Sequence, residues 1–350
     1  MKNFKIFFLL FLMFSVKIGR AQKVGDAGDY LTAIANAQVE MNSRYMQYMS
    51  TAAHLLKQKN AETLRRQVLE SITNSQLKTT ALPAFAGDNN LRQSSIDYIQ
   101  LVYNVFNNDF GQIVSMKEIE EQSFNEMQKT ILIQEKAAQK LIEASLAVTN
   151  ATLDFAKKYR VDFTSQRDKL SEKLAVAARL NHYVNEVFLL FYKCNWEDKE
   201  INKAIEAKKV NEIEQGRSAL LQYAVIGMKV LETMKNYDGD PSLKYSCRET
   251  LNFYKQIAQG EIPQLTEFYI TEENYNKIKK DFEASAKHTK AEIFAYNAEI
   301  KNYNTAVTRY NQVNNFILAN RRLVLNNYNS TEKLFLDTHM PHFREKNTKK

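Results

Sequence analysis

The sequence has few of the residues that bend or break a chain. Only nine glycines and four prolines occur among its 350 residues. A β-sandwich or barrel needs a turn about every 8–12 residues, usually built from Gly, Pro, Asn or Asp, and nucleotide-binding folds need glycine in their phosphate loops. Because apolar residues also recur at helical spacing throughout, the sequence predicts an all-α fold of long helices.

Motifs for catalysis and cofactor binding are also lacking. The chain has no Gly-x-x-x-x-Gly-Lys-Ser/Thr, no Gly-x-Gly-x-x-Gly and no Gly-x-Ser-x-Gly sequence, and these motifs mark phosphate loops and hydrolase nucleophiles. None of its five histidines belongs to His-Glu-x-x-His or follows a glutamate by three residues, as zinc and di-iron helices require. We interpret His339 and His342 as part of a solvated tail. We therefore expect no enzyme activity, no metal and no cofactor.

The positive charge is concentrated at the two ends of the chain. The formal net charge is +8, but residues 1–21 contain four basic residues and no acidic one, which leaves +4 for the rest. The tail from Arg344 contributes four basic residues against one acidic residue, or +3 of that remainder. A nucleic-acid-binding protein is expected to keep a basic patch on its folded surface. The nearly neutral body therefore predicts no nucleic-acid partner.

Residues 1–21 have the pattern of a secretory signal peptide. Lys2 and Lys5 precede nine consecutive apolar residues at 6–14, and Gly19 and Ala21 supply the small residues of a cleavage site. The apolar run is shorter than the roughly 20 residues that span a bilayer, and no later run is longer. We expect a mature protein that begins at Gln22, without a transmembrane span, in the periplasm or at the cell surface. An uncleaved anchor is the alternative.

Apolar spacing divides the rest of the chain into helices separated by two breaks, at residues 83–88 and 238–241. The expected helices are 27–58, 60–80, 90–110, 118–159, 166–206, 209–235, 242–268 and 272–328. The last of them carries a seam with alternating steps of three and four residues, which is typical of a coiled coil: Ile293, Tyr296, Ile300, Tyr303, Val307, Tyr310, Asn314 and Ile317. Helices of about 40 residues are about 60 Å long, so the sequence predicts an elongated bundle of long antiparallel helices.

The two breaks resemble each other at an offset of 152 residues. The repeat-equivalent positions are Gly87 with Gly239, Asp88 with Asp240, and Arg65 with Arg217. After a slip of one residue, a Glu-x-x-aromatic-Asn helix start at Glu121 matches one at Glu272. This series predicts two tandem copies of a four-helix unit. The expected organisation is a signal peptide at 1–21, helical units at 22–165 and 166–328, and a basic tail at 329–350, with about a dozen extra residues in the second copy near 194–209.

The chain contains two cysteines, Cys194 and Cys247. Export places them where disulfides persist, and an even count leaves neither unpaired, so a disulfide between them is one interpretation. Two separate thiols, buried as small apolar residues, are the alternative.

Three short features resemble an uncharacterised family of exported α-helical surface proteins of Bacteroidetes and spirochaetes. They are the leader ending Ala21-Gln22, the AGDNNLR stretch from Ala86 to Arg92, and the YDGDPSLK stretch from Tyr237 to Lys244. The resemblance implies a helical fold and a surface or periplasmic location, and it brings no catalytic residues. We expect a structural or protein-interaction role with another envelope protein or surface component as partner. A carrier of an apolar or amphiphilic ligand inside the bundle is the alternative.

Overall fold

The computed structural model describes residues 15–16, 26–55, 58–109, 124–162, 165–166 and 169–343. The expected cleavage site after Ala21 and the basic residues from Arg344 onward lie outside these described residues. The chain forms two compact units, one made of residues 1–185 with 333–350 and the other of residues 186–332. These units are defined by packing, and their boundaries differ from the 165/166 and 328/329 boundaries that the sequence repeat suggests.

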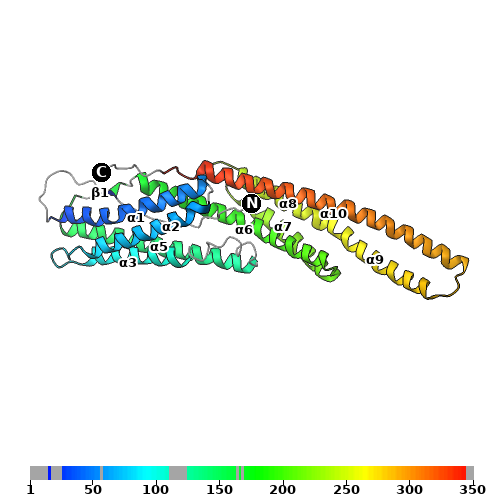
Figure 1. The fold of residues 1–350 in the computed structure, drawn as a ribbon. Helices are drawn as coiled ribbons and strands as arrows, with labels where there is room; N and C mark the ends of the chain where they lie inside the picture. The colour runs from blue at the N-terminus through cyan, green and yellow to red at the C-terminus, as the bar shows by residue number, and fades with distance from the viewer. Residues whose placement is uncertain are drawn as a thin grey trace. The chain divides into compact units, whose positions relative to one another are not determined.

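Within the described residues the fold is all-α, with neighbouring helices packed antiparallel, apart from one pair of two-residue strands (Figure 1). The helices are α1 (Ala27–Leu55), α2 (Gln58–Thr80), α3 (Asn90–Asn104), the π-helical turn η1 (Val105–Asp109), α5 (Phe124–Lys158), α6 (Lys169–Glu206), α7 (Val210–Thr233), α8 (Ser242–Gln259), α9 (Glu261–Ala284) and α10 (Lys290–His339). The strands β1 (Ser15–Val16) and β2 (Ser165–Gln166) pair antiparallel. Because β1 belongs to the expected leader, this pair would exist only in the uncleaved chain.

Three helix boundaries near the C-terminal end differ from the expected ones. The expected helix 242–268 is interrupted at Gly260, so that α8 ends at Gln259 and α9 begins at Glu261. Pro263 lies in the first turn of α9, where a missing backbone N–H breaks no helical hydrogen bond. Glu272 therefore lies inside α9, and its interpretation as a helix start was wrong.

The expected helix 272–328 is also two helices, because residues 285–289 form a turn between α9 and α10. Thr289 and Glu292 form a capping box at this point: the Thr289 hydroxyl accepts from the Glu292 N–H at 3.2 Å, and the Glu292 carboxylate accepts from the Thr289 N–H at 2.6 Å. From there α10 continues to His339. It passes residue 328, where we had expected the helix to end and the tail to begin.

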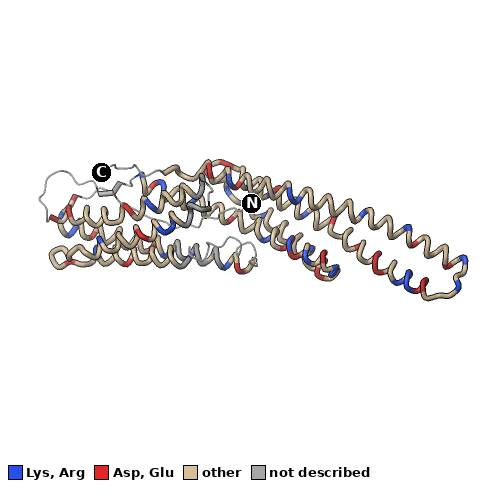
Figure 2. Tube along the Cα trace, viewed as in Figure 1, with Lys and Arg blue, Asp and Glu red and all other residues tan. Residues whose placement is uncertain are grey.

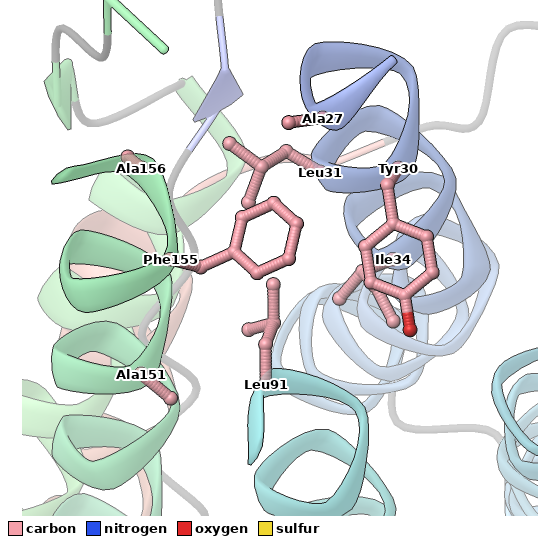
Figure 3. Close-up of a cluster of buried hydrophobic side chains, with 8 residues drawn as sticks. All are labelled: Ala27, Tyr30, Leu31, Ile34, Leu91, Ala151, Phe155 and Ala156. Carbon is pink, nitrogen blue, oxygen red and sulfur yellow. The ribbon is translucent and has the colours of Figure 1, made fainter. Parts of the chain in front are cut away.

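One end of the first unit is closed by an aromatic cluster that joins α1, α5 and the turn before α3. Figure 3 shows Phe155 of α5 between side chains of α1 and Leu91 of α3. The Phe155 ring lies 5.4 Å from that of Tyr30 and 5.3 Å from that of Phe85. Tyr30 also donates to the Pro83 carbonyl at 2.9 Å. Burial of these rings holds the turn against the ends of the two helices.

Candidate functional site

The two breaks singled out in the sequence form turns of the same backbone conformation. Gly87 has φ +80° and Gly239 has φ +84°, and the residues before them, Ala86 and Asp238, also have positive φ. Two consecutive residues with positive φ are the signature of a type I′ turn, which favours glycine at the second position. Each turn is closed by an isolated β-bridge, Phe85 with Asp88 in the first and Tyr237 with Asp240 in the second.

Hydrogen bonds around the two turns also correspond at the offset of 152. The Asp88 carboxylate accepts from the Asn90 N–H at 3.0 Å, and the Asp240 carboxylate accepts from the Ser242 N–H at 2.8 Å. Arg92 donates to the Leu82 carbonyl at 2.5 Å, and in the same relative place Lys244 donates to the Met234 carbonyl at 2.8 Å. These side chains tie each turn to the helices on either side of it.

Asp88 also forms an ion pair. The Lys158 ammonium lies 2.7 Å from the Asp88 carboxylate and lowers the pKa of that carboxyl. Arg65 and Arg217, the other matched pair, are both half-buried, on α2 and α7. Arg217 contacts Glu214 at 2.7 Å and donates to the Ala258 carbonyl at 3.2 Å. The matched positions therefore support turns and helix ends.

The structure does not join the two cysteines in a disulfide, and both side chains are buried. The Cys247 sulfur lies 3.7 Å from the carbonyl oxygen of Val187 on α6. Cys194 stands seven residues further along the same helix, or about 10 Å at 1.5 Å per residue. A disulfide requires Cα atoms within about 7 Å, so the register of α8 against α6 separates the two sulfurs by two helical turns.

Beside Cys194, a cluster of polar side chains joins α6, α8 and α10 within the second unit. Asp198 is 1% exposed. One of its carboxylate oxygens accepts a 2.8 Å hydrogen bond from Arg321 Nη2, and the other lies 2.7 Å from Arg321 Nε without the alignment of a hydrogen bond. Nearby, the buried Tyr254 hydroxyl donates to Asn195 at 3.2 Å. Helices distant in sequence are thereby joined through paired polar groups.

Burial governs the chemistry of these side chains. It raises the pKa of the Cys194 thiol to about 12, and it raises the pKa of Tyr254 well above its usual value. It also raises the pKa of Asp198, an effect that the charge of Arg321 partly offsets. A thiol with so high a pKa is almost entirely protonated at neutral pH and is a poor nucleophile. The group is therefore suited to holding helices together.

The interior of the first unit contains buried polar side chains for which the described residues provide no hydrogen-bond partner. Asn42 of α1, Ser75 of α2 and Ser95 of α3 are 1%, 1% and 0% exposed. Within the described part of the chain, no hydrogen-bond partner reaches either amide atom of Asn42 or the hydroxyls of Ser75 and Ser95. A buried polar group without a partner costs about 1–3 kcal/mol. Three such side chains in one helical core therefore require an explanation.

The hairpin formed by residues 270–312 of α9 and α10 is the most exposed part of the second unit. None of these 43 residues is buried. Its two helices contact through aromatic layers that recur every seven residues on both helices. The ring pairs are Phe268 with Tyr310 at 4.5 Å, Tyr275 with Tyr303 at 4.4 Å, and Phe282 with Tyr296 at 4.2 Å.

These layers explain the expected seam at Tyr296, Tyr303 and Tyr310. Its partners are Phe268, Tyr275 and Phe282 of α9, whose heptad spacing is readable in the sequence but which the sequence analysis missed. His288, in the turn, stacks on Phe282 at 3.7 Å and so continues the last layer. The tyrosine seam packs within this chain.

The outer faces of the hairpin carry apolar side chains that this packing leaves in contact with solvent. Phe294 is 78% exposed, and Ile270, Ile278 and Ile293 are 39–50% exposed. Figure 1 shows α9 and α10 side by side up to their connecting turn, and Figure 2 shows acidic and basic residues interspersed along them. The hairpin's outer surface is thus mixed in charge, with separate apolar side chains among the charged ones.

No group of three or more His, Cys, Asp or Glu side chains among the described residues is placed to hold a metal ion. In the same part of the chain, no helix is long and apolar enough to cross a membrane. The sequence matches no protein-family model, and comparisons with curated proteins and with solved structures give no match either.

Proposed function

We propose that this protein is an exported helical protein of the cell envelope with a structural or protein-interaction role and no catalytic activity. The observation that carries the proposal is the α9–α10 hairpin. Its internal contacts are the aromatic layers, and it presents Phe294 and three isoleucines to solvent. None of residues 270–312 is buried, so the outer faces of both helices are accessible to a partner. We expect that partner to be another envelope protein or surface component.

Site-specific photo-crosslinking in the native envelope tests this role. A photoreactive residue replaces Phe294 on the hairpin, and a matched control replaces Leu77, which is 64% exposed on α2 of the other unit. We expect a discrete crosslinked partner at position 294 that is absent at position 77. Equal labelling at both positions, or none at position 294, would contradict the interaction role.

Export to the periplasm or cell surface is part of the same proposal, and it is supported by the leader-like residues 1–21. The resemblance to exported surface proteins points in the same direction. The intact mass of the protein recovered from the envelope fraction tests export. We expect a chain that begins at Gln22; a mass that includes residues 1–21 would favour the uncleaved anchor.

We also propose that the chain arose by duplication of a four-helix unit, with α1, α2, α3 and α5 matching α6, α7, α8 and α10. The first residues of α2 and α7 differ by 152, as do those of α3 and α8. A further likeness is the pair of ring contacts Tyr30 with Phe155, at 5.4 Å and 24°, and Tyr183 with Phe335, at 5.8 Å and 25°.

Under this proposal, the additional residues of the second copy enter between α8 and the end of α10, in place of the position near 194–209 that the sequence alone suggests. The ring-contact residues Tyr30 and Tyr183 differ by 153 and the first residues of α2 and α7 by 152, so the offset is nearly unchanged across this stretch. Phe155 and Phe335 are 180 residues apart, against 152 at the turns, so about 28 residues enter between α8 and the end of α10. The protruding hairpin accounts for them. An experimental structure in which residues 58–104 fail to superpose on 210–256 would contradict the duplication.

The alternative function is a carrier of an apolar or amphiphilic ligand, and the interior of the first unit favours it. Met41, Met46 and Met49 of α1 are fully buried there, and methionine adapts its shape to irregular partners. Native mass spectrometry of protein purified from the envelope distinguishes the two roles. A carrier retains a bound small molecule.

A further inference from the structure

The three unpartnered polar side chains of the first unit lie close to one level of the helical bundle. Lys78 of α2 contacts Glu40 of α1 at 3.0 Å, so Ser75, three residues earlier in antiparallel α2, lies opposite the segment of α1 that holds Asn42. Arg92 contacts the Leu82 carbonyl, which places α3 against α2 in the same way. Ser95 then lies about one helical turn from Ser75, toward the Gly87 turn.

The hydroxyls of Ser75 on α2 and Ser95 on α3 differ from two other buried hydroxyls of the first unit, those of Ser71 and Thr79 on α2. The Ser71 hydroxyl donates to the Val68 carbonyl at 2.6 Å, and the Thr79 hydroxyl donates to the Ser75 carbonyl at 2.8 Å. Such bonds to the preceding turn satisfy a hydroxyl inside a helix without outside help. Ser75 and Ser95 make no such bond within the described part of the chain, so their oxygens are left for a group that lies between the helices.

The three side chains specify the chemistry of that group. Asn42 offers an N–H₂ donor and a carbonyl acceptor, and each serine hydroxyl both donates and accepts. None of the three carries a charge, so these side chains supply nothing to neutralise a bound ion. A neutral oxygen that both donates and accepts hydrogen bonds, which is the chemistry of water or of an alcohol, fits them best.

We propose that the core of the first unit, between α1, α2 and α3, binds a neutral hydroxyl-type group held by Asn42, Ser75 and Ser95. The group is supplied either by ordered internal water or by the hydroxyl head of an amphiphilic ligand. The proposal does not rest on the interaction role of the hairpin, because the hairpin belongs to the other unit.

The source of the hydroxyl is identified with the wild-type mature protein. Native mass spectrometry after purification from the envelope gives an added mass if an amphiphile supplies it. If water supplies it, no mass is added, and magnetisation transfer from long-lived water to the Asn42 side-chain amide is seen by NMR. Absence of both an added mass and a water signal would overturn the proposal.

The substitution Asn42→Leu tests the same site, because the two possibilities predict opposite changes in the thermal midpoint of unfolding. Asn42→Leu keeps a similar volume and removes both polar atoms. If they are bonded to a bound hydroxyl, the thermal midpoint of the full mature chain falls by several degrees; if they are unbonded, the change raises the midpoint, because an unpaired polar group is lost. Ser71→Ala is the matched control, since that hydroxyl bonds only its own helix, and it leaves the added mass or water signal in place. A rise in the midpoint for Asn42→Leu would refute the site.

Discussion

Replacement of Arg321 by methionine tests the buried ion pair between Arg321 and Asp198 in the second unit. Methionine retains much of the arginine's apolar length but removes the charge from beside Asp198, which is 1% exposed. Removal of one partner from a buried ion pair costs about 3–5 kcal/mol, because the other charge stays buried. At about 2–4 °C per kcal/mol for a chain of this size, we expect the midpoint to fall by about 10 °C.

The asymmetry of burial between the two partners refines this expectation. The Arg321 side chain is 15% exposed and the Asp198 side chain 2%. An arginine left alone by Asp198→Asn can reach water, whereas a carboxylate left alone by Arg321→Met cannot. We therefore expect Arg321→Met to destabilise the unit more than Asp198→Asn does. Replacement of both, as Asp198→Leu with Arg321→Met, is expected to recover most of the loss, because no unpaired charge remains buried.

The loss of stability caused by Arg321→Met should also depend on pH. Burial already raises the pKa of Asp198, and removal of Arg321 raises it further. A carboxyl whose pKa is higher in the folded than in the unfolded state loses stability as pH rises through that interval. The penalty of Arg321→Met should thus be smallest below the raised pKa of Asp198 in the wild type, where the carboxyl is protonated in both proteins, and should grow as pH rises above that pKa.

Fluorescence of Trp196, the only tryptophan, provides the assay because it lies two residues from Asp198. Urea unfolding is followed at pH 5 and pH 8. Arg309→Met is the matched control, because Arg309 is exposed on the same helix and contacts Gln264; we expect a change within about 0.5 kcal/mol. A loss below about 1 kcal/mol for Arg321→Met, with no dependence on pH, would refute the reasoning.

Three further predictions follow from single side chains or turns. Peptide mapping should recover Cys194 and Cys247 as free thiols, and with a pKa of about 12 Cys194 should alkylate about 10³-fold more slowly at pH 8 in the folded than in the unfolded chain; recovery of a linked peptide would contradict this. Thr289→Ala should speed hydrogen exchange in the first turn of α10 but not in that of α7, and unchanged exchange would show that the capping box contributes nothing. The hydrogen bonds that the Glu292 carboxylate accepts from Thr289 lower the pKa of Glu292. Acid should therefore weaken this cap in the wild type as pH falls through that pKa. Gly87→Ala and Gly239→Ala should each lower the unfolding free energy by about 1–2 kcal/mol, because an added Cβ meets nothing within 4 Å and only the positive φ is strained; calorimetry that shows no loss at either position would mean that these turns relax.

Much of the local structure could be predicted from the sequence. The scarcity of glycine and proline indicated long helices, and each Gly-Asp break became a turn with positive φ, because that conformation is a property of the residues themselves. The tyrosine heptads of α10 likewise lie in a packed seam. The turn at 285–289 was missed, although Thr289 and Glu292 have the spacing of a capping box and carried a readable signal.

Contacts between distant segments were decided only by the tertiary structure. Asp198 and Arg321 are 123 residues apart, and no local pattern marks either as the partner of the other. Cys194 and Cys247 looked suited to a disulfide, but the register of α8 on α6 places Cys247 beside Val187 instead. Asn42, Ser75 and Ser95 are ordinary polar residues in the sequence, and only packing reveals that all three are buried. Periodicity determines which face of a helix is apolar, whereas side-chain packing between helices determines which residues on those faces meet.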